Sequence, residues 1–246
     1  MSLPTSEQEK KDIAAAQGEM SLVDHLQEFR RRIIICIVVL LITSTASYMY
    51  VEDIVSLISA PVGKLYFMNP AEVFFSYLKV AFFAGFLESL PVILYQLWAF
   101  ILPALTSSEK KLSFILVPSS VLLFFVGVLF SYFFVLPAGV KFFLGFATET
   151  LLPMFSLEAY LSFVISFLLP FGIIFELPLC LLVLAKLGFV SSVFLKRKRK
   201  IILVLSFVIA AVISPTPDVF SQTMIAIPII LLYEASIVLV KYIIKK

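Results

Sequence analysis

Charged residues are scarce in this chain of 246 residues, making up 14% of it, whereas hydrophobic residues make up 61%. The mean hydropathy of +1.09 lies well above the range that soluble domains tolerate. This shortage of charge excludes a soluble globular protein. The long apolar runs that replace the missing charges predict an integral membrane protein.

Residues that commonly catalyse reactions or bind metals are also few. The only histidine, His25, lies in a polar segment, and both cysteines, Cys36 and Cys180, lie in apolar runs. None of the patterns HExxH, GxSxG and GxxxxGK[ST] occurs. We therefore expect no enzyme activity, cofactor, metal centre, disulfide or nucleic-acid partner, and the sequence argues against an intramembrane hydrolase or a P-loop ATPase.

Six charge-poor runs are candidates for crossing about 30 Å of hydrocarbon. They cover residues 33–51, 77–102, 114–136, 159–185, 201–213 and 219–240. Only the turn sequence SPTPD separates the last two. The pattern predicts an all-α, polytopic membrane protein with six transmembrane helices in one domain, residues 21–246, after a flexible cytoplasmic tail over residues 1–20.

Basic residues are distributed unevenly between the two sides of the predicted bundle. Sixteen lysines and arginines fall on the side of the N-terminus, and three, Lys64, Lys79 and Lys141, fall on the other side. The positive-inside rule therefore predicts that both termini are cytoplasmic. The outer connections, residues 52–76 and 137–158, are rich in Pro, Phe and Tyr and predict interfacial cap helices.

The run FGIIFELPLC places a carboxylate, Glu176, inside the fourth predicted span. Glu176 lies ten residues before Lys186, which at 1.5 Å per residue is roughly 15 Å into the membrane. A charge at that depth costs on the order of 3 kcal/mol, so we expect Glu176 to face a cavity or a partner. Gln222, four residues after Asp218, is expected at a similar depth because the fifth span is short. A hydrogen-bonded structural acid is the alternative.

Further acids lie at or near the predicted cytoplasmic face. In HLQEFRRR, residues 25–32, Glu28 lies one helical turn from Arg31 and Arg32, and an intrahelical ion pair is the simplest interpretation. Glu109 follows YQLWAFILPALTSS, whose Trp98 we expect to be an interfacial anchor. Glu88 in the second span lies eight residues from Gln96, so the two are expected on one helix face.

Together these motifs resemble a known family. HLQEFRRR, PVILYQLWAFILPAL with Glu109, FGIIFELP and PTPDVFSQTMIAIPIILLYE resemble TatC, the core subunit of the twin-arginine protein translocase. The resemblance covers about residues 21–244, in the right order. It implies a six-helix membrane protein shaped like a cupped, glove-like hand, with the last two helices short.

The resemblance also implies a function and partners. The implied function is a receptor for twin-arginine signal peptides in a translocase that exports folded proteins across the prokaryotic cytoplasmic (inner) membrane, driven by the proton-motive force. The implied partners are the single-span subunits TatA and TatB, the signal peptides of folded cargo and membrane lipids, in an oligomeric complex. The implied signal-binding residues are Glu28, Glu109, Phe100, Pro103, His25 and Leu26, and the implied intramembrane docking residues are Glu176, Gln222 and Asp218.

The chemistry of the acids fits these roles. A guanidinium is a planar fork of donors that a carboxylate accepts bidentately, so two acids on one surface can recognise two consecutive arginines and discriminate against lysine. The alternative function is a proton-coupled secondary transporter that uses Glu176 and Glu88 as carriers. The absence of a visible internal repeat argues against that alternative.

Overall fold

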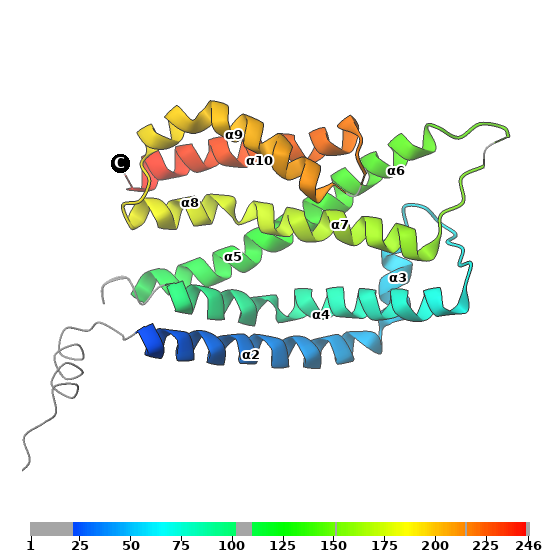
Figure 1. The fold of residues 1–246 in the computed structure, drawn as a ribbon, viewed down its shortest axis with the longest axis horizontal. Coiled ribbons are helices and arrows are strands. Elements are labelled where there is room, and N and C mark those ends of the chain that lie inside the picture. Colours follow the sequence, from blue (N-terminus) through cyan, green and yellow to red (C-terminus); the bar gives the residue numbers. More distant parts are fainter. Residues whose placement is uncertain (1–21, 102–109, 151, 215, 245–246) are drawn as a thin grey trace, which may run out of the picture.

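A computed structural model describes residues 22–101, 110–150, 152–214 and 216–244, and Figure 1 shows that the long helices of this part run side by side. The described part is almost entirely helical, with a single isolated β-bridge in it. The predicted all-α fold class is confirmed. The tail predicted over residues 1–20 lies outside the described residues.

The helices follow one another without intervening strands in the described part. Their bounds are α2 Leu22–Tyr48, α3 Val51–Ser59, α4 Pro70–Ile101, α5 Lys110–Phe130, the π-helical segment η3 Ser131–Val135, α6 Leu136–Leu144, α7 Leu157–Phe175, α8 Leu177–Lys186, α9 Ser192–Ile213, α10 Val219–Leu239 and the π-helical segment η4 Val240–Ile244.

Within the described ranges, four helical segments are long and apolar enough to cross a membrane, namely Pro70–Ile101, Ile115–Leu144, Leu157–Lys186 and Val219–Ile244. A fifth candidate is the first helix together with α3, which are bent by 79° relative to each other. Helix α9 begins with a basic run, and its apolar part is residues 201–213, about 20 Å long. This agrees with the predicted short fifth span.

Prolines explain where the fourth span is interrupted. Pro178 has no N–H to donate to the carbonyl four residues before it, so the regular bonding pattern fails at the junction of α7 and α8. Glu176 lies at this junction, and its N–H donates to the Ile173 carbonyl at 3.1 Å, one residue closer than in an α-helix. The regular α-helical hydrogen bonding of the span is therefore interrupted at the buried acid.

Helix α2 packs chiefly against α4, at the edge of the bundle (Figure 1). The two helices approach closely at Gly85, where a Cβ atom would lie 2.4 Å from the Ser44 backbone. Thr43 Oγ1 donates to the Gly85 carbonyl at 2.7 Å. The absence of a side chain at Gly85 thus sets the position of the whole first helix.

The connections at the predicted outer end form what we call the outer cap, which consists of α3 and residues 60–69 and 152–157. Tyr66 N–H donates to the Phe155 carbonyl at 3.0 Å and Leu157 N–H donates to the Tyr66 carbonyl at 2.7 Å. Helix α3, Val51–Ser59, shows that part of residues 52–76 is helical, as predicted. The prediction for residues 137–158 is wrong in part, because α6 continues the third span to Leu144.

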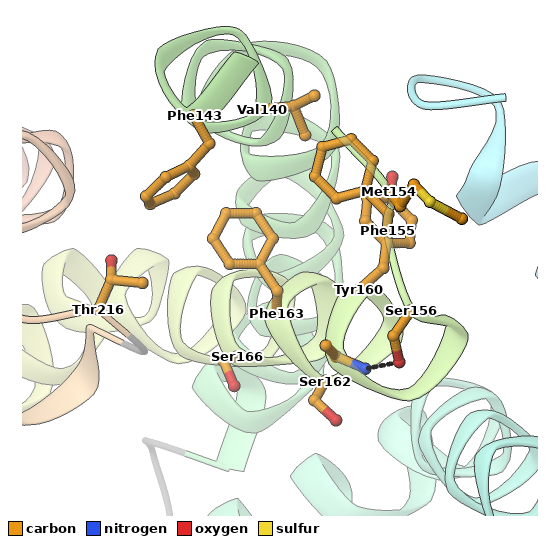
Figure 2. Close-up of a pocket in the computed structure, with 11 residues that line it drawn as sticks. Val140, Phe143, Met154, Phe155, Ser156, Tyr160, Ser162, Phe163, Ser166 and Thr216 are labelled. Atoms are coloured by element: carbon orange, nitrogen blue, oxygen red, sulfur yellow. Dashed lines mark hydrogen bonds between the residues drawn. The ribbon is translucent and has the colours of Figure 1, made fainter. Parts of the chain in front are cut away.

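A cavity of about 540 Å³ lies beside the outer cap (Figure 2). Figure 2 shows the Phe163 ring of α7 pointing toward Phe143 of α6, whereas the hydroxyl groups of Ser162 and Ser166 point the other way. The two rings meet edge to face with centroids 5.8 Å apart. Most of the lining is apolar, with Thr216 from the turn before α10 at one side.

Candidate functional site

The beginning of α2 and the last turns of α4 form a polar cluster at the predicted cytoplasmic end. Arg32 Nε and Nη2 both donate to Glu28 Oε1, at 3.0 and 2.5 Å. Arg32 Nη1 donates to Gln96 Oε1 at 2.8 Å. The intrahelical ion pair predicted for Glu28 is therefore present, with Arg32 as its partner, and Gln96 ties this pair to α4.

The two carboxylate oxygens of Glu28 differ in their hydrogen bonding. The Glu28 side chain is 23% exposed. Its Oε2 atom is buried and has no hydrogen-bond partner among the described residues. A buried acceptor without a donor is costly, so this atom is suited to receive a donor from outside the described part. Glu109 and Pro103, both predicted to contribute here, lie outside the described residues.

Aromatic rings lie next to the Glu28 pair. The His25 and Phe100 rings stack with centroids 4.4 Å apart, and Phe29 contacts Phe100 at 5.2 Å. The Leu26 side chain is 66% exposed. The structure thus brings His25, Glu28 and Phe100 together at one end of the α2–α4 pair, with Leu26 facing outward beside them.

Glu176 is buried where three helices meet. Its Oε2 accepts a hydrogen bond from Ser120 Oγ of α5, and Ser120 Oγ in turn accepts from Trp98 Nε1 of α4 at 3.0 Å. Its Oε1 is buried and lacks a partner among the described residues. Glu176 thus has part of the structural role given above as the alternative, and retains one unpaired acceptor.

Sequence reasoning missed both partners of this buried acid. Trp98 is only 3% exposed and donates into the protein, so the prediction that it is an interfacial anchor is wrong. Ser120 gave no sequence signal of its own, because a serine inside an apolar span commonly bonds only to its own helix backbone. Ser120 and Trp98 could be found only from the pairing of α4, α5 and α7.

Asp218 and Gln222 lie at the start of α10. Asp218 is the N-cap residue, and its Oδ1 accepts from Ser221 N–H at 2.7 Å and its Oδ2 from Thr216 Oγ1 at 2.5 Å. Partial burial acts to raise the pKa of Asp218, but these hydrogen bonds outweigh burial and lower the pKa below its ordinary value. Gln222 is half-buried, and among the described residues its side chain forms no hydrogen bond with Glu176.

The remaining intramembrane acid, Glu88, is exposed on α4. Glu88 and Gln96, which were expected on one helix face, form no hydrogen bond with each other, and the Gln96 amide oxygen accepts from Arg32 of α2. In the part of the chain that the structure describes, no group of three His, Cys, Asp or Glu residues could hold a metal ion.

The sequence and structure are similar to those of known proteins. The family model described as "Sec-independent protein translocase protein (TatC)" matches residues 24–228. A protein of that name from Carboxydothermus hydrogenoformans is 38% identical over 91% of this chain and 94% of its own length. Another from Aquifex aeolicus is 42% identical over 90% of this chain and 95% of its own length.

A solved structure gives the same result. A crystal structure titled "Twin Arginine Translocase Receptor- TatC in DDM" superposes with a TM-score of 0.80 at 41% identity, covering 88% of this chain and 99% of that chain. The match confirms the predicted fold class. These comparisons do not favour the alternative of a proton-coupled transporter, because every one of these matches is to a protein translocase component.

Proposed function

Because the chain belongs to the TatC family of Sec-independent protein translocase proteins, we propose that it is the receptor for signal peptides with two consecutive arginines. As a member of this family it is a multi-pass membrane protein and a component of a protein translocase. We further propose that it acts in the prokaryotic cytoplasmic membrane with both termini cytoplasmic. Transport of folded cargo would be driven by the proton-motive force.

The proposal rests on the carboxylate of Glu28, because only one of its two oxygens accepts a hydrogen bond from the described residues. Arg32 donates to Oε1 and is itself held by Gln96, while Oε2 has no donor among the described residues. Arg32 shows that the site accommodates a guanidinium. An incoming arginine would donate to Oε2 with its planar fork, and lysine, a point donor on a flexible chain, would bind less well.

The aromatic rings support the same ligand. A guanidinium stacks on aromatic faces, and Phe100 lies beside Glu28 in a stack with His25. Glu109 would accept the second arginine from the loop between α4 and α5. Pro103 in that loop and the exposed Leu26 would contact residues that flank the arginine pair.

Partner subunits are the second part of the proposal. We propose that the single-span subunits TatA and TatB dock near Glu176, Gln222 and Asp218. The unpaired Oε1 of Glu176 supports this role, because a buried acceptor is stabilised by a polar group on a neighbouring membrane helix. Replacing Glu176 with alanine should then spare signal binding and weaken assembly or transport. Wild-type export by that variant would leave Glu176 with a structural role only.

The receptor assignment is tested with the full chain in lipid nanodiscs and a fluorescent signal peptide carrying either two arginines or two lysines. Glu28→Gln and Glu109→Lys should each weaken binding of the arginine peptide by about a hundredfold, because charge-assisted hydrogen bonds are lost. Glu52→Gln, an exposed acid on α3, is the matched control and should bind normally. Normal binding by both Glu28 and Glu109 variants, or equal affinity for both peptides, would remove the receptor assignment.

A further inference from the structure

Glu88 is an exposed carboxylate on the membrane-spanning helix α4, and nothing in the proposed receptor site uses it. Its side chain forms no hydrogen bond or ion pair within the part of the chain that the structure describes. Its exposure places it on the outside of the helical bundle. An acid in that position has to find its stabilising contact beyond this chain.

The contacts between α2 and α4 give the depth of Glu88. Gln96 contacts Arg32, which is paired with Glu28, so this level of α4 lies at the polar end of the span. Glu88 is eight residues deeper than Gln96, about 12 Å along the helix. Half of a hydrocarbon layer is about 15 Å thick, so Glu88 lies near the middle of the bilayer.

Acids at this depth are costly when they face lipid and are normally paired. Acyl chains offer no hydrogen-bond donor, so a lipid cannot supply the missing contact. The neighbouring backbone adds a second acceptor, because Pro91 has no N–H to donate to the carbonyl of Leu87, four residues earlier. A carboxyl group has an acceptor oxygen in either protonation state. This face of α4 therefore presents two adjacent acceptors and lacks a donor from its own helix.

We propose that Glu88 docks a membrane-spanning helix of a partner subunit through a hydrogen-bond donor on that helix, such as a hydroxyl, amide or basic side chain. Ala84, one turn before Glu88, is a small residue that lets a second helix approach closely. This surface is separate from the Glu28 cluster and from Glu176. The inference depends on the placement of α4 in the membrane and not on signal recognition.

The test uses the purified full chain in lipid nanodiscs and a labelled Leu/Ala membrane-spanning peptide with one central glutamine. The same peptide with leucine in place of glutamine is the reference. Binding is measured by energy transfer between labels on the peptide and on the protein. The wild type should prefer the glutamine peptide by about tenfold, Glu88→Leu should abolish the preference, and Glu88→Gln, whose amide oxygen still accepts, should keep part of it.

Two controls make the result specific. Glu52→Gln, an exposed acid on α3, should retain the preference. Glu88→Leu should unfold at the wild-type temperature and bind the twin-arginine peptide normally, since Glu88 is exposed and forms no hydrogen bond or ion pair with the described residues of that site. Equal binding of both peptides by the wild type would overturn the proposal. A preference that survives in Glu88→Leu would also overturn it. Reduced transfer between two labelled copies of Glu88→Leu, with no effect on either peptide, would overturn it in favour of a contact between copies of this chain.

Discussion

Glu72 in the outer part of α4 and Glu28 at the start of α2 are carboxylates at opposite ends of the molecule, and they differ in how fully their oxygens are used. Glu72 Oε1 accepts from Ser156 Oγ at 2.6 Å and from Glu158 N–H at 3.1 Å, and Oε2 accepts from Met68 N–H at 2.8 Å. Glu28 uses only Oε1. A carboxylate with both oxygens occupied fixes loops, whereas one with a free oxygen can bind a ligand.

The surroundings of the two acids explain this difference. Glu72 lies where the outer connections meet, and its donors come from parts of the chain that it holds together. The donors to Glu28 come from Arg32 on its own helix, and Gln96 of α4 holds that arginine. The outer cap is therefore complete in itself. The Glu28 cluster is held by α4 on one side, and Glu28 Oε2 lacks a donor among the described residues.

The largest effect is expected from separating α2 from α4. In Gly85→Val the new side chain would collide with the Ser44 backbone, which cannot move away as a flexible side chain could. Displacement of α2 from α4 would separate His25 and Glu28 from Phe100 and should abolish binding of the twin-arginine peptide, measured in nanodiscs, while the outer cap stays intact. Gly139→Ala is the control, because its Cβ would meet only the tip of the Phe163 ring. Wild-type affinity in Gly85→Val would show that the site does not depend on this helix pair.

An intermediate effect is expected at the outer end. Glu72→Ala removes the acceptor for three hydrogen bonds and should lower the Tm measured by thermal unfolding in detergent. Binding of the twin-arginine peptide should not change, since Glu72 is remote from Glu28. Glu149→Ala, an exposed acid in the same outer region, should leave the Tm unchanged. If Glu72→Ala lost peptide binding at an unchanged Tm, the distinction between the two ends would be wrong.

The smallest effect is expected from Gln96→Leu. This change releases Arg32 on the α4 side but leaves its pair with Glu28, so one hydrogen bond worth roughly 0.5–1.5 kcal/mol is lost. Affinity for the twin-arginine peptide should fall by about threefold in the nanodisc assay. Gln27→Leu, on the exposed side of α2, should have no effect. A loss as large as that of Glu28→Gln would mean that Gln96 contacts the peptide directly.

The sequence predicted features that depend on local patterns. Apolar runs predicted the spans, and the spacing of Glu28 and Arg32 predicted their ion pair, because both follow from the geometry of one helix. The 79° bend after α2 was missed because no proline or positive-φ glycine occurs at Met49 and Tyr50.

Features that depend on the pairing of distant helices could not be read from the sequence. The contact between Trp98 and Ser120 joins two helices through residues 22 positions apart. Depth alone suggested that Gln222 would lie near Glu176, but depth does not determine which way a side chain points. The partner of Glu176 depends on the crossing of α5 and α7, which hydropathy does not encode.

Trp98 is the only tryptophan in the chain, and it lies two residues before Phe100, whose ring stacks on His25. Its indole is hydrogen-bonded to Ser120 and sealed from solvent. The protein consequently carries its own optical probe, whose emission originates between the proposed arginine-binding surface and the acid in the bilayer. If a bound peptide rotated the last turns of α4, the emission wavelength of Trp98 would change, and no added label would be needed to measure it.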